Sequence, residues 1–136
     1  MVKGLGGDHN YGNTREWYKK AAQAGDKKAK KELAKLSQLK ELIKERAISD
    51  STGDVRQAAV QEIARGWKED PDILPWLKER AVSDSAGDVR QAAVQEIARG
   101  WKENPDTLPW LKERAASDEN SDVRRAAIQE LGRIRY

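Results

Sequence analysis

Rows of glutamine and arginine are the side chains in this sequence whose types and spacing best suit binding chemistry. They recur every four residues within three similar stretches and every 34 residues between the stretches. Amide and guanidinium groups donate hydrogen bonds, and an arginine can hold a carboxylate through two parallel hydrogen bonds. The predicted site, a surface for an acidic protein or peptide, consists of Gln57, Gln61, Arg65, Gln91, Gln95, Arg99, Arg125, Gln129 and Arg133.

An ordinary solvated helix face is the alternative interpretation of the same rows. Glu62, Glu96 and Glu130 stand beside them in the sequence and could pair with the arginines within the protein. Exposed ion pairs of this kind are common and stabilise a protein little. The sequence leaves both interpretations open.

Catalytic and cofactor-binding residues form no coherent set in the chain. His9 is the only histidine and stands in a glycine-rich stretch, without the partners and fixed frame that a catalytic triad or a zinc site needs. The neighbouring GLGG lacks the strand and helix that surround a phosphate-binding glycine loop. The absence of cysteine excludes disulfides, thiolate metal sites and cysteine nucleophiles. We therefore predict a protein that is not an enzyme and that holds no cofactor.

Carboxylates gather at two joints between predicted helices. Glu69, Asp70 and Asp72 form the first group, and Glu103 with Asp106 repeats it. Such groups could hold Ca²⁺, but the ordered spacing of a calcium loop is missing. Their position just before a helix favours capping and stabilisation of the helix dipole, so no metal site is predicted.

A 34-residue repeat positions all of these residues. Residues 43–76 and 77–110 are identical at 29 of 34 positions, and a drifting third copy occupies 111–136. Self-similarity at this period predicts a solenoid, in which each unit buries its apolar face against its neighbours. Helical periodicity and the short joints predict three helical hairpins, at about 38–68, 72–102 and 106–135.

Each hairpin combines two helices with different signals. The second helix carries an apolar stripe at helical spacing, at positions 55, 59, 60, 63 and 67 of the first copy. Its predicted N-caps are Asp54, Asp88 and Asp122, with Gln57 and Gln91 in the reciprocal position of a capping box. The first helix is predicted to begin after Asp72 or Asp106, with Pro75 or Pro109 in its first turn. Its predicted buried face comprises Leu74, Leu77, Ala81 and Val82.

Tryptophans mark both helices of the repeat. Trp67 and Trp101 end the apolar stripes and are expected to lie between consecutive hairpins, where they bury a large apolar area. Trp76 and Trp110 follow proline in the first helix. They either belong to the core or form a ladder of aromatic side chains on the outer surface.

The string DVRQAAVQEIARGW resembles a HEAT repeat of the short bacterial type, similar to those of phycobilin-lyase-like proteins and of arrays attached to NACHT-type signalling NTPases. The resemblance implies an all-α fold, a right-handed α-solenoid of helical hairpins with about eight helices, whose second helices line the concave face. It also implies links between adjacent repeats through a turn aspartate and a helix arginine. By position, these pairs would be Asp54/Arg56, Asp88/Arg90 and Asp122/Arg124.

The N-terminal segment carries a different signal. The stretch NTREWYKKAAQAGDKKA resembles the second half of a Sel-one-like repeat, a tetratricopeptide relative. Helices are predicted at about 14–24 and 27–36, with Asn13 as a cap, Glu16 three residues on and Gly25 as a stop. The resulting domain prediction is a flexible leader at 1–13, a Sel-one-like helical cap at 14–37, and three repeats at 38–70, 71–104 and 105–136, packed as one continuous solenoid.

Charge and hydropathy define the remaining function hypotheses. Residues 1–48 carry 12 Lys and Arg against 6 Asp and Glu, whereas residues 49–136 carry 14 against 17. The leading hypothesis is a non-catalytic protein-interaction scaffold, natural or consensus-designed, which we expect to be a cytoplasmic monomer without a membrane segment. Its first alternative is a nucleic-acid-binding protein that uses the lysine-rich region 19–44. The second alternative is a subunit or sensor fragment of a larger enzyme or NTPase complex.

Overall fold

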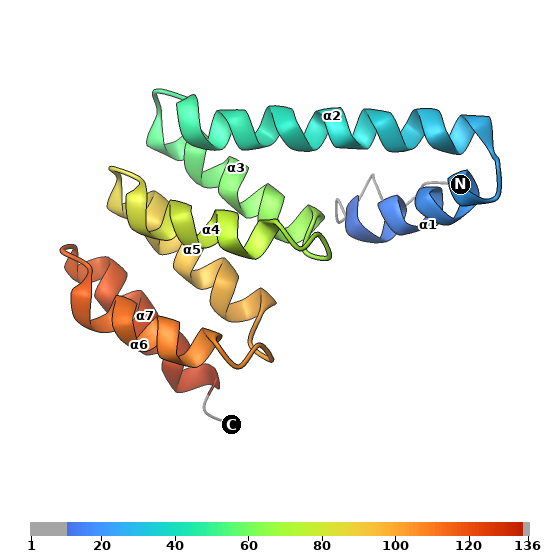
Figure 1. Ribbon diagram of the computed structural model, residues 1–136. Coiled ribbons are helices and arrows are strands. Elements are labelled where there is room, and N and C mark those ends of the chain that lie inside the picture. The colour runs from blue at the N-terminus through green and yellow to red at the C-terminus, as the bar shows by residue number, and fades with distance from the viewer. Residues whose placement is uncertain (1–10, 135–136) are drawn as a thin grey trace.

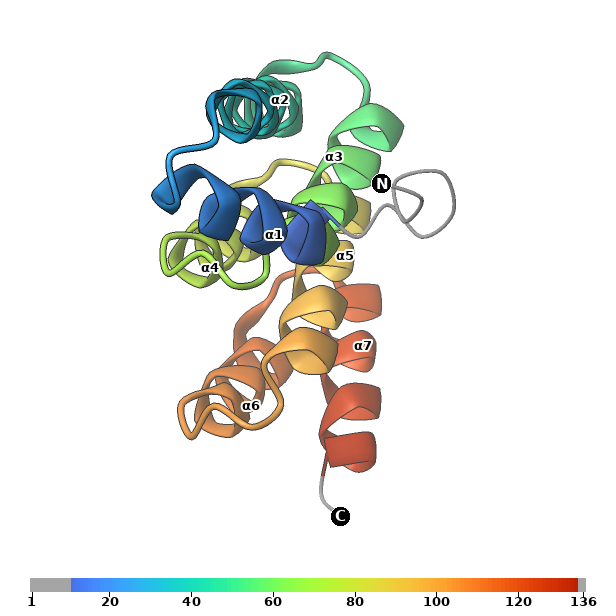
Figure 2. The same ribbon diagram turned by 90° about the vertical axis from the view of Figure 1, so that its right-hand side faces the viewer.

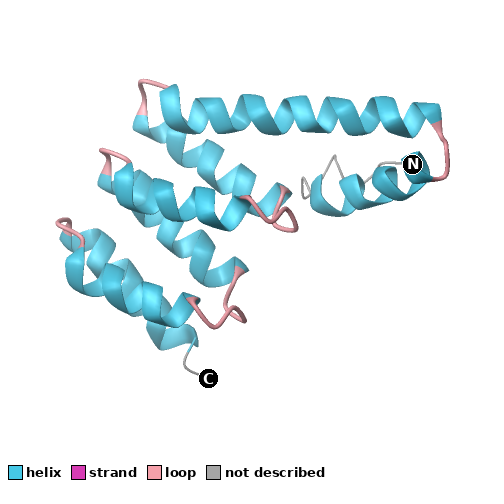
Figure 3. Cartoon of the chain, in the orientation of Figure 1, coloured by secondary structure: helices cyan, strands magenta, loops and turns pink. Residues whose placement is uncertain are grey.

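The computed structural model describes residues 11–134, in which all regular structure is helical (Figures 1 and 3). The seven helices of this part of the chain are α1 (Tyr11–Gln23), α2 (Lys27–Ser49), α3 (Gly53–Gly66), α4 (Ile73–Ser83), α5 (Gly87–Gly100), α6 (Thr107–Ser117) and α7 (Ser121–Ile134). The predicted all-α class is confirmed. His9 and the GLGG stretch lie outside the described residues.

Three helical hairpins stack into an α-solenoid. Helices α2 and α3, α4 and α5, and α6 and α7 form the pairs, and α3, α5 and α7 make one column (Figure 2). Successive hairpins are joined mainly through this column of second helices, while the first helices spread along the opposite side. One core of aliphatic and alanine side chains runs through the column. The predicted solenoid is therefore confirmed.

Helix α2 differs from the prediction, because it replaces two predicted helices with one. The spacing predicts a helix at 27–36 followed by a separate first helix of the first hairpin, but residues 27–49 form one uninterrupted helix. The stretch contains neither glycine nor proline, whereas Pro71 and Pro105 stand before the corresponding helices of the later hairpins. The helix count of about eight is consequently too high for the described residues.

The predicted N-caps of the second helices are wrong by two residues. Helix α3 begins at Gly53 after Thr52, and α5 begins at Gly87 after Ala86. The aspartates expected as caps, Asp54, Asp88 and Asp122, therefore lie in the first turn, where a negative charge still favours the helix dipole. With the helices starting earlier, Gln57 and Gln91 lie beyond the reciprocal position of a capping box. The turns are closed instead by the side chains of Asp50, Asp84 and Asp118, which accept the N–H groups of Thr52, Ala86 and Asn120.

Helices α4 and α6 begin where predicted, but their two caps and one core residue behave differently. Asp72 and Asp106 are the N-cap residues, yet neither side chain makes a capping hydrogen bond. Leu77 and Ala81 are buried as predicted, together with Ile73. Val82 is 52% exposed, so its assignment to the buried face is wrong. Leu74 is half-buried against the core.

The apolar stripe of α3 is buried except at its first position. Val60 and Ile63 of α3 are fully buried, but Val55 is 41% exposed. Its counterparts Val89 and Val123 are fully buried. The difference arises because α5 and α7 each have a preceding second helix to pack against and α3 does not.

Helix α1 packs mainly against α2. It packs on α2 through a small cluster centred on Tyr18, Ala29 and Leu36, and also contacts α3. The helix begins at Tyr11, so the prediction of Asn13 as its N-cap is wrong. Gly25 ends the segment as predicted, with a φ of +93° that side-chain-bearing residues rarely adopt. Asp26 then caps α2 by accepting the N–H groups of Lys28 and Ala29.

Candidate interaction surface

The predicted glutamine and arginine rows lie along the column of second helices. Arg65 ends the first row, Arg99 the second and Arg133 the third, one on each of α3, α5 and α7. Their side chains are 59%, 50% and 63% exposed, respectively. The glutamines of α3 and α5 are half-buried, whereas Arg125 and Gln129 of α7 are exposed. All nine residues therefore lie on the column of second helices. On α3 and on α5, the arginine is more exposed than the two glutamines.

Each of these arginines also binds a glutamate. Arg65 on α3 donates to both carboxylate oxygens of Glu96 on α5, with Nη2–Oε2 at 2.7 Å and Nε–Oε1 at 3.3 Å. The hydrogen bond to Glu96 raises the pKa of Arg65, against the effect of burial. Arg99 repeats the link to Glu130 of α7 at 3.1 Å, and Arg133 donates to the same carboxylate at 2.9 Å. Internal pairing is therefore a real property of these rows, as the alternative interpretation expects for Glu96 and Glu130.

The same rows border a hollow at the C-terminal end of the solenoid. It measures about 770 Å³ and lies where α5, α6 and α7 meet. Its lining residues are Ala98, Arg99, Lys102, Glu103, Asn104, Pro105, Leu108, Glu130, Arg133 and Ile134. Arg99 and Arg133 belong to the predicted site. Lys102, in the turn that follows α5, adds a third cation.

Apolar side chains of the hollow could not be identified as surface from the sequence. Leu108 is 36% exposed, although its counterpart Leu74 in the preceding repeat is half-buried. Ile134 stands where the preceding copy has Gly100, and it packs partly against the core. Three cations, two glutamates and several apolar side chains therefore line the hollow, and this net positive lining suits a polypeptide that carries both carboxylates and apolar side chains.

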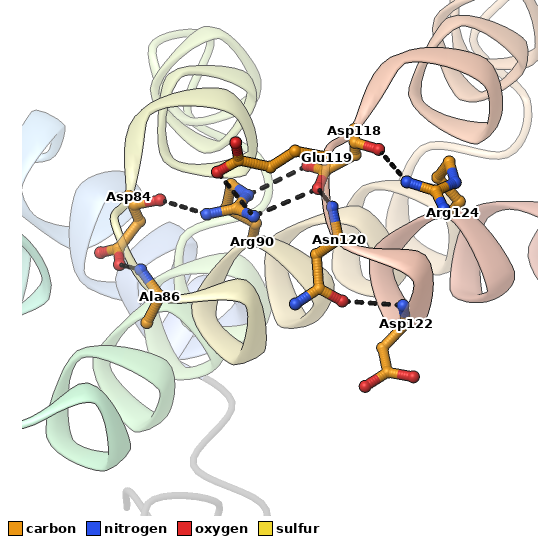
Figure 4. Close-up of polar contacts among 8 residues, drawn as sticks. All are labelled: Asp84, Ala86, Arg90, Asp118, Glu119, Asn120, Asp122 and Arg124. Atoms are coloured by element: carbon orange, nitrogen blue, oxygen red, sulfur yellow. Dashed lines mark hydrogen bonds and ion pairs between the residues drawn. The ribbon is translucent and has the colours of Figure 1, made fainter.

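A second set of arginines links the repeats inside the structure (Figure 4). Arg90 lies between Asp84 and Asp118: Nη1 donates to the Asp84 carbonyl at 2.8 Å, while Nε and Nη2 donate to the Asp118 carboxylate at 3.0 and 3.1 Å. Arg56 makes the same contacts with the Asp50 carbonyl and the Asp84 carboxylate. Arginines therefore link adjacent repeats as predicted.

The predicted aspartate partners of these arginines are wrong. Asp54, Asp88 and Asp122 were the positions implied by the HEAT resemblance, but the carboxylates come from Asp84 and Asp118, at the turn of the following hairpin. Arg124 of the last repeat donates to the carbonyl of Asp118, and in the described residues no carboxylate lies at its other edge. The aspartates two residues before each arginine are exposed in the first turn of their own helix instead.

Charge interactions shift the pKa of the buried pair. The hydrogen bond to Asp118 raises the pKa of Arg90, outweighing burial. Burial alone would raise the pKa of Asp118, but hydrogen bonds from Arg90 and the Asn120 N–H, with nearby positive charges, lower it overall. Both groups are thus held in their charged forms.

The acidic joint before α4 is neutralised by lysines of α2. Lys40 lies 2.9 Å from an Asp70 oxygen and 3.1 Å from an Asp72 oxygen, and Lys44 lies 3.4 Å from Asp72. Burial opposes ionisation of Asp72, but the Lys40 hydrogen bond and both lysine charges lower its pKa overall. Across the described residues, no group of three or more His, Asp or Glu side chains has an arrangement that could hold a metal ion.

The tryptophans divide between core and surface. Trp67 is fully buried in the main core as predicted, and Trp101 is half-buried against it. Trp76 and Trp110 are also half-buried, and cations lie over their rings. Arg80 lies 6.0 Å from the Trp76 ring centroid and Arg114 lies 5.9 Å from that of Trp110. These outer tryptophans therefore pack at the core margin beneath arginines, between the two locations that the sequence allows.

In residues 11–134, every helix is too short or too polar to span a membrane.

Comparisons with known proteins identify the family. The searches of curated proteins and of solved structures found no match to the chain. The family model described as HEAT repeats matches residues 39–132, which covers all three hairpins and more than half of the sequence. The chain belongs to the HEAT repeat family.

Proposed function

We propose that this protein is a non-catalytic interaction module that binds an acidic, extended segment of another protein on its column of second helices. The observation that carries the proposal is the hollow between α5, α6 and α7, which is lined by three cations, two glutamates and apolar side chains and so has a net positive lining. HEAT repeats are commonly protein-interaction scaffolds, and the family is typically non-catalytic. The resemblance to arrays attached to signalling NTPases adds support for recognition of a protein partner.

The ion pairs within the protein leave the arginines of this surface able to bind a ligand. Glu130 is nearly fully buried, with its side chain 4% exposed, whereas Arg99 and Arg133 are at least half exposed. Each guanidinium has five N–H donors in a planar fork, so an arginine that meets a glutamate along one edge retains donors for a ligand. Holding the fork on a buried carboxylate also reduces the entropy lost when a ligand carboxylate binds.

Acidic-peptide binding can be measured directly by fluorescence anisotropy. The probe is a labelled peptide of alternating Asp and Leu, and its control is the same peptide with Asn in place of Asp. We expect the double variant K102Q/R133Q to weaken binding of the acidic peptide by roughly 3- to 10-fold, because each exposed charge contact contributes up to about 1 kcal/mol. The Asn peptide should bind weakly to all forms.

A matched variant separates the hollow from general charge attraction. K31Q/K112Q removes the same net charge at exposed lysines on α2 and α6, away from the hollow. It should leave the affinity within about twofold of the wild type. Equal weakening by both double variants, or no binding of the acidic peptide to the wild type at millimolar concentration, would exclude the proposed site.

Nucleic-acid binding by the N-terminal hairpin is the second candidate function. Exposed lysines gather at the start of α2, namely Lys27, Lys28, Lys30, Lys31 and Lys35. Trp17 of the adjoining α1 is 56% exposed and could stack on a base. Lys40 and Lys44, by contrast, are engaged by the acidic joint. A labelled single-stranded oligonucleotide should show binding at low salt that W17A weakens; no anisotropy change at low salt would exclude this function.

A further inference from the structure

The column of second helices contains two internal junctions, α3 on α5 and α5 on α7. At both internal junctions, a second helix buries its outward face against the next one. Val60 of α3 and Val94 of α5 become fully buried in this way, and so do Val89 and Val123 on the receiving helices. The two junctions therefore bury equivalent valines in the same way.

Helix α7 ends the column with its outward face uncovered (Figure 2). Ile128 occupies the position of Val60 and Val94 but is 58% exposed. Arg124 occupies the position of Arg56 and Arg90, each of which binds an aspartate carboxylate on the following repeat. Helix α7 thus presents an apolar side chain and an arginine arranged as at an internal junction.

Helix α3 starts the column with the complementary face uncovered. Val55 is partly exposed and Ala58 is exposed, whereas Ala92 and Ala126, the counterparts of Ala58, are buried. Asp50 occupies the position of Asp84 and Asp118, the carboxylates that receive the inter-repeat arginines. Its own ion pair is a long one, at 3.8 Å from Arg46.

We propose that the chain associates head to tail with copies of itself, with α7 of one copy packing on α3 of the next as a further repeat junction. Arg124 would then bind Asp50 of the second copy, and Ile128 would be buried beside Val55 and Ala58. Charge and shape complementarity both favour a second copy as the occupant, because the same pairs of positions already meet twice within one chain. Such an interface is heterologous and leaves a free end at each step, so it produces open chains of copies.

One position of the proposed junction between copies differs from the equivalent position at the two internal junctions. At the second internal junction a Cβ atom on Gly87 would lie 2.6 Å from Nδ2 of Asn120, whereas at the first a Cβ atom on Gly53 would meet the smaller Ala86 at 3.7 Å. Ser121 stands at this position on α7 and would face Thr52 of the second copy. The extra atoms make the junction between copies weaker than the internal ones, and S121G should strengthen it.

Two variants, each blocking one end, test the proposal by sedimentation velocity. For the wild type, the weight-average mass should rise with concentration above the 15.3 kDa of one chain and continue past that of a dimer. V55E blocks the α3 end and I128E blocks the α7 end, so each alone should stay monomeric. Mixed together, they retain one intact end each and should form a dimer that grows no further.

The controls make each outcome decisive. V82E changes a valine on α4 that is somewhat more exposed than Val55 and lies away from both ends, and it should assemble like the wild type. Melting temperatures verify folding, and A58E replaces V55E if the latter melts early. A monomeric wild type at millimolar concentration, a wild-type mass that stops at two chains, or a mixture of V55E and I128E that stays monomeric would each overturn the proposal.

Discussion

Arg90 and Asp118 form a nearly buried, two-point ion pair across the junction between the second and third repeats. The side chains are 6% and 4% exposed, and two hydrogen bonds of 3.0 and 3.1 Å join them. The third bond of Arg90, to the Asp84 carbonyl, ties the turn of its own hairpin to the same guanidinium. One side chain therefore fixes both the local turn and the position of the next repeat.

Removal of this arginine should be strongly destabilising. R90M leaves the Asp118 carboxylate buried without its cation, which typically costs about 3–5 kcal/mol. R125M is the control, since it breaks a pair with Asp122 in which both side chains are mostly exposed, and should cost less than about 1 kcal/mol. Urea unfolding followed by circular dichroism gives both values. A cost of R90M as small as that of R125M would show that the junction does not depend on the pair.

The pKa of Asp118 predicts the direction of a pH effect. Its pKa is lower in the folded protein than the usual value of about 3.9. The ionised carboxylate therefore stabilises the fold fully above pH of about 4, and this contribution is lost as the pH falls toward the folded-state pKa. The free energy of unfolding should fall in acid for the wild type and less steeply for D118N. A stability difference between the two proteins that stays constant from neutral pH into this acidic range would contradict the assignment.

The partner of Arg90 shows where the sequence ceases to predict the structure. Helices and their pairing follow from local periodicity and short joints, and the exposed arginines follow from the same periodicity. The arginine's partner lies 28 residues away, however, and depends on how two hairpins stack. Several aspartates near each turn satisfy the sequence pattern equally well, so the nearer Asp88 was predicted wrongly.

The hollow was unpredictable for a related reason. Leu108 and Leu74 stand in nearly identical sequences, but Leu108 is 36% exposed and Leu74 is half-buried. The difference depends on how neighbouring helices pack around each leucine, and the local sequence carries no signal for it. The fusion of two predicted helices into α2, by contrast, could have been foreseen from the lack of any helix-breaking residue between 27 and 49.

The two glutamates that bind the exposed arginines should respond differently to arginine removal. In the described structure, Glu96 accepts hydrogen bonds from Arg65 alone, whereas Glu130 accepts them from both Arg99 and Arg133. R65A leaves a buried carboxylate without a partner and should cost about 1–3 kcal/mol. R99A should cost less, because Arg133 still binds Glu130. The measurement is urea unfolding of the two variants, and equal costs would mean that the second arginine contributes nothing.

Glycine at the start of α5 is required by one side chain of the next repeat. A Cβ atom on Gly87 would lie 2.6 Å from Nδ2 and 3.0 Å from Cγ of Asn120, closer than side chains pack. Asn120 cannot turn away freely, because its Oδ1 accepts the Asp122 N–H at 2.7 Å at the start of α7. The Cβ atom of G53A would meet Ala86 at 3.7 Å and Nη2 of Arg56 at 3.9 Å, both ordinary contacts. This substitution should stabilise the protein by about 0.5–1 kcal/mol, as alanine does in place of a helical glycine.

G87A should lack this gain and instead lower the free energy of unfolding by about 0.5–2 kcal/mol, the usual cost of a lost capping interaction. The double variant G87A/N120A copies the first junction, where alanine stands opposite the glycine. Adding G87A to an N120A background should therefore be stabilising, with the opposite sign to its effect in the wild type. Urea unfolding of the four proteins in this cycle measures the coupling between the two positions. If G87A has the same effect in both backgrounds, the contact with Asn120 is not what requires glycine here.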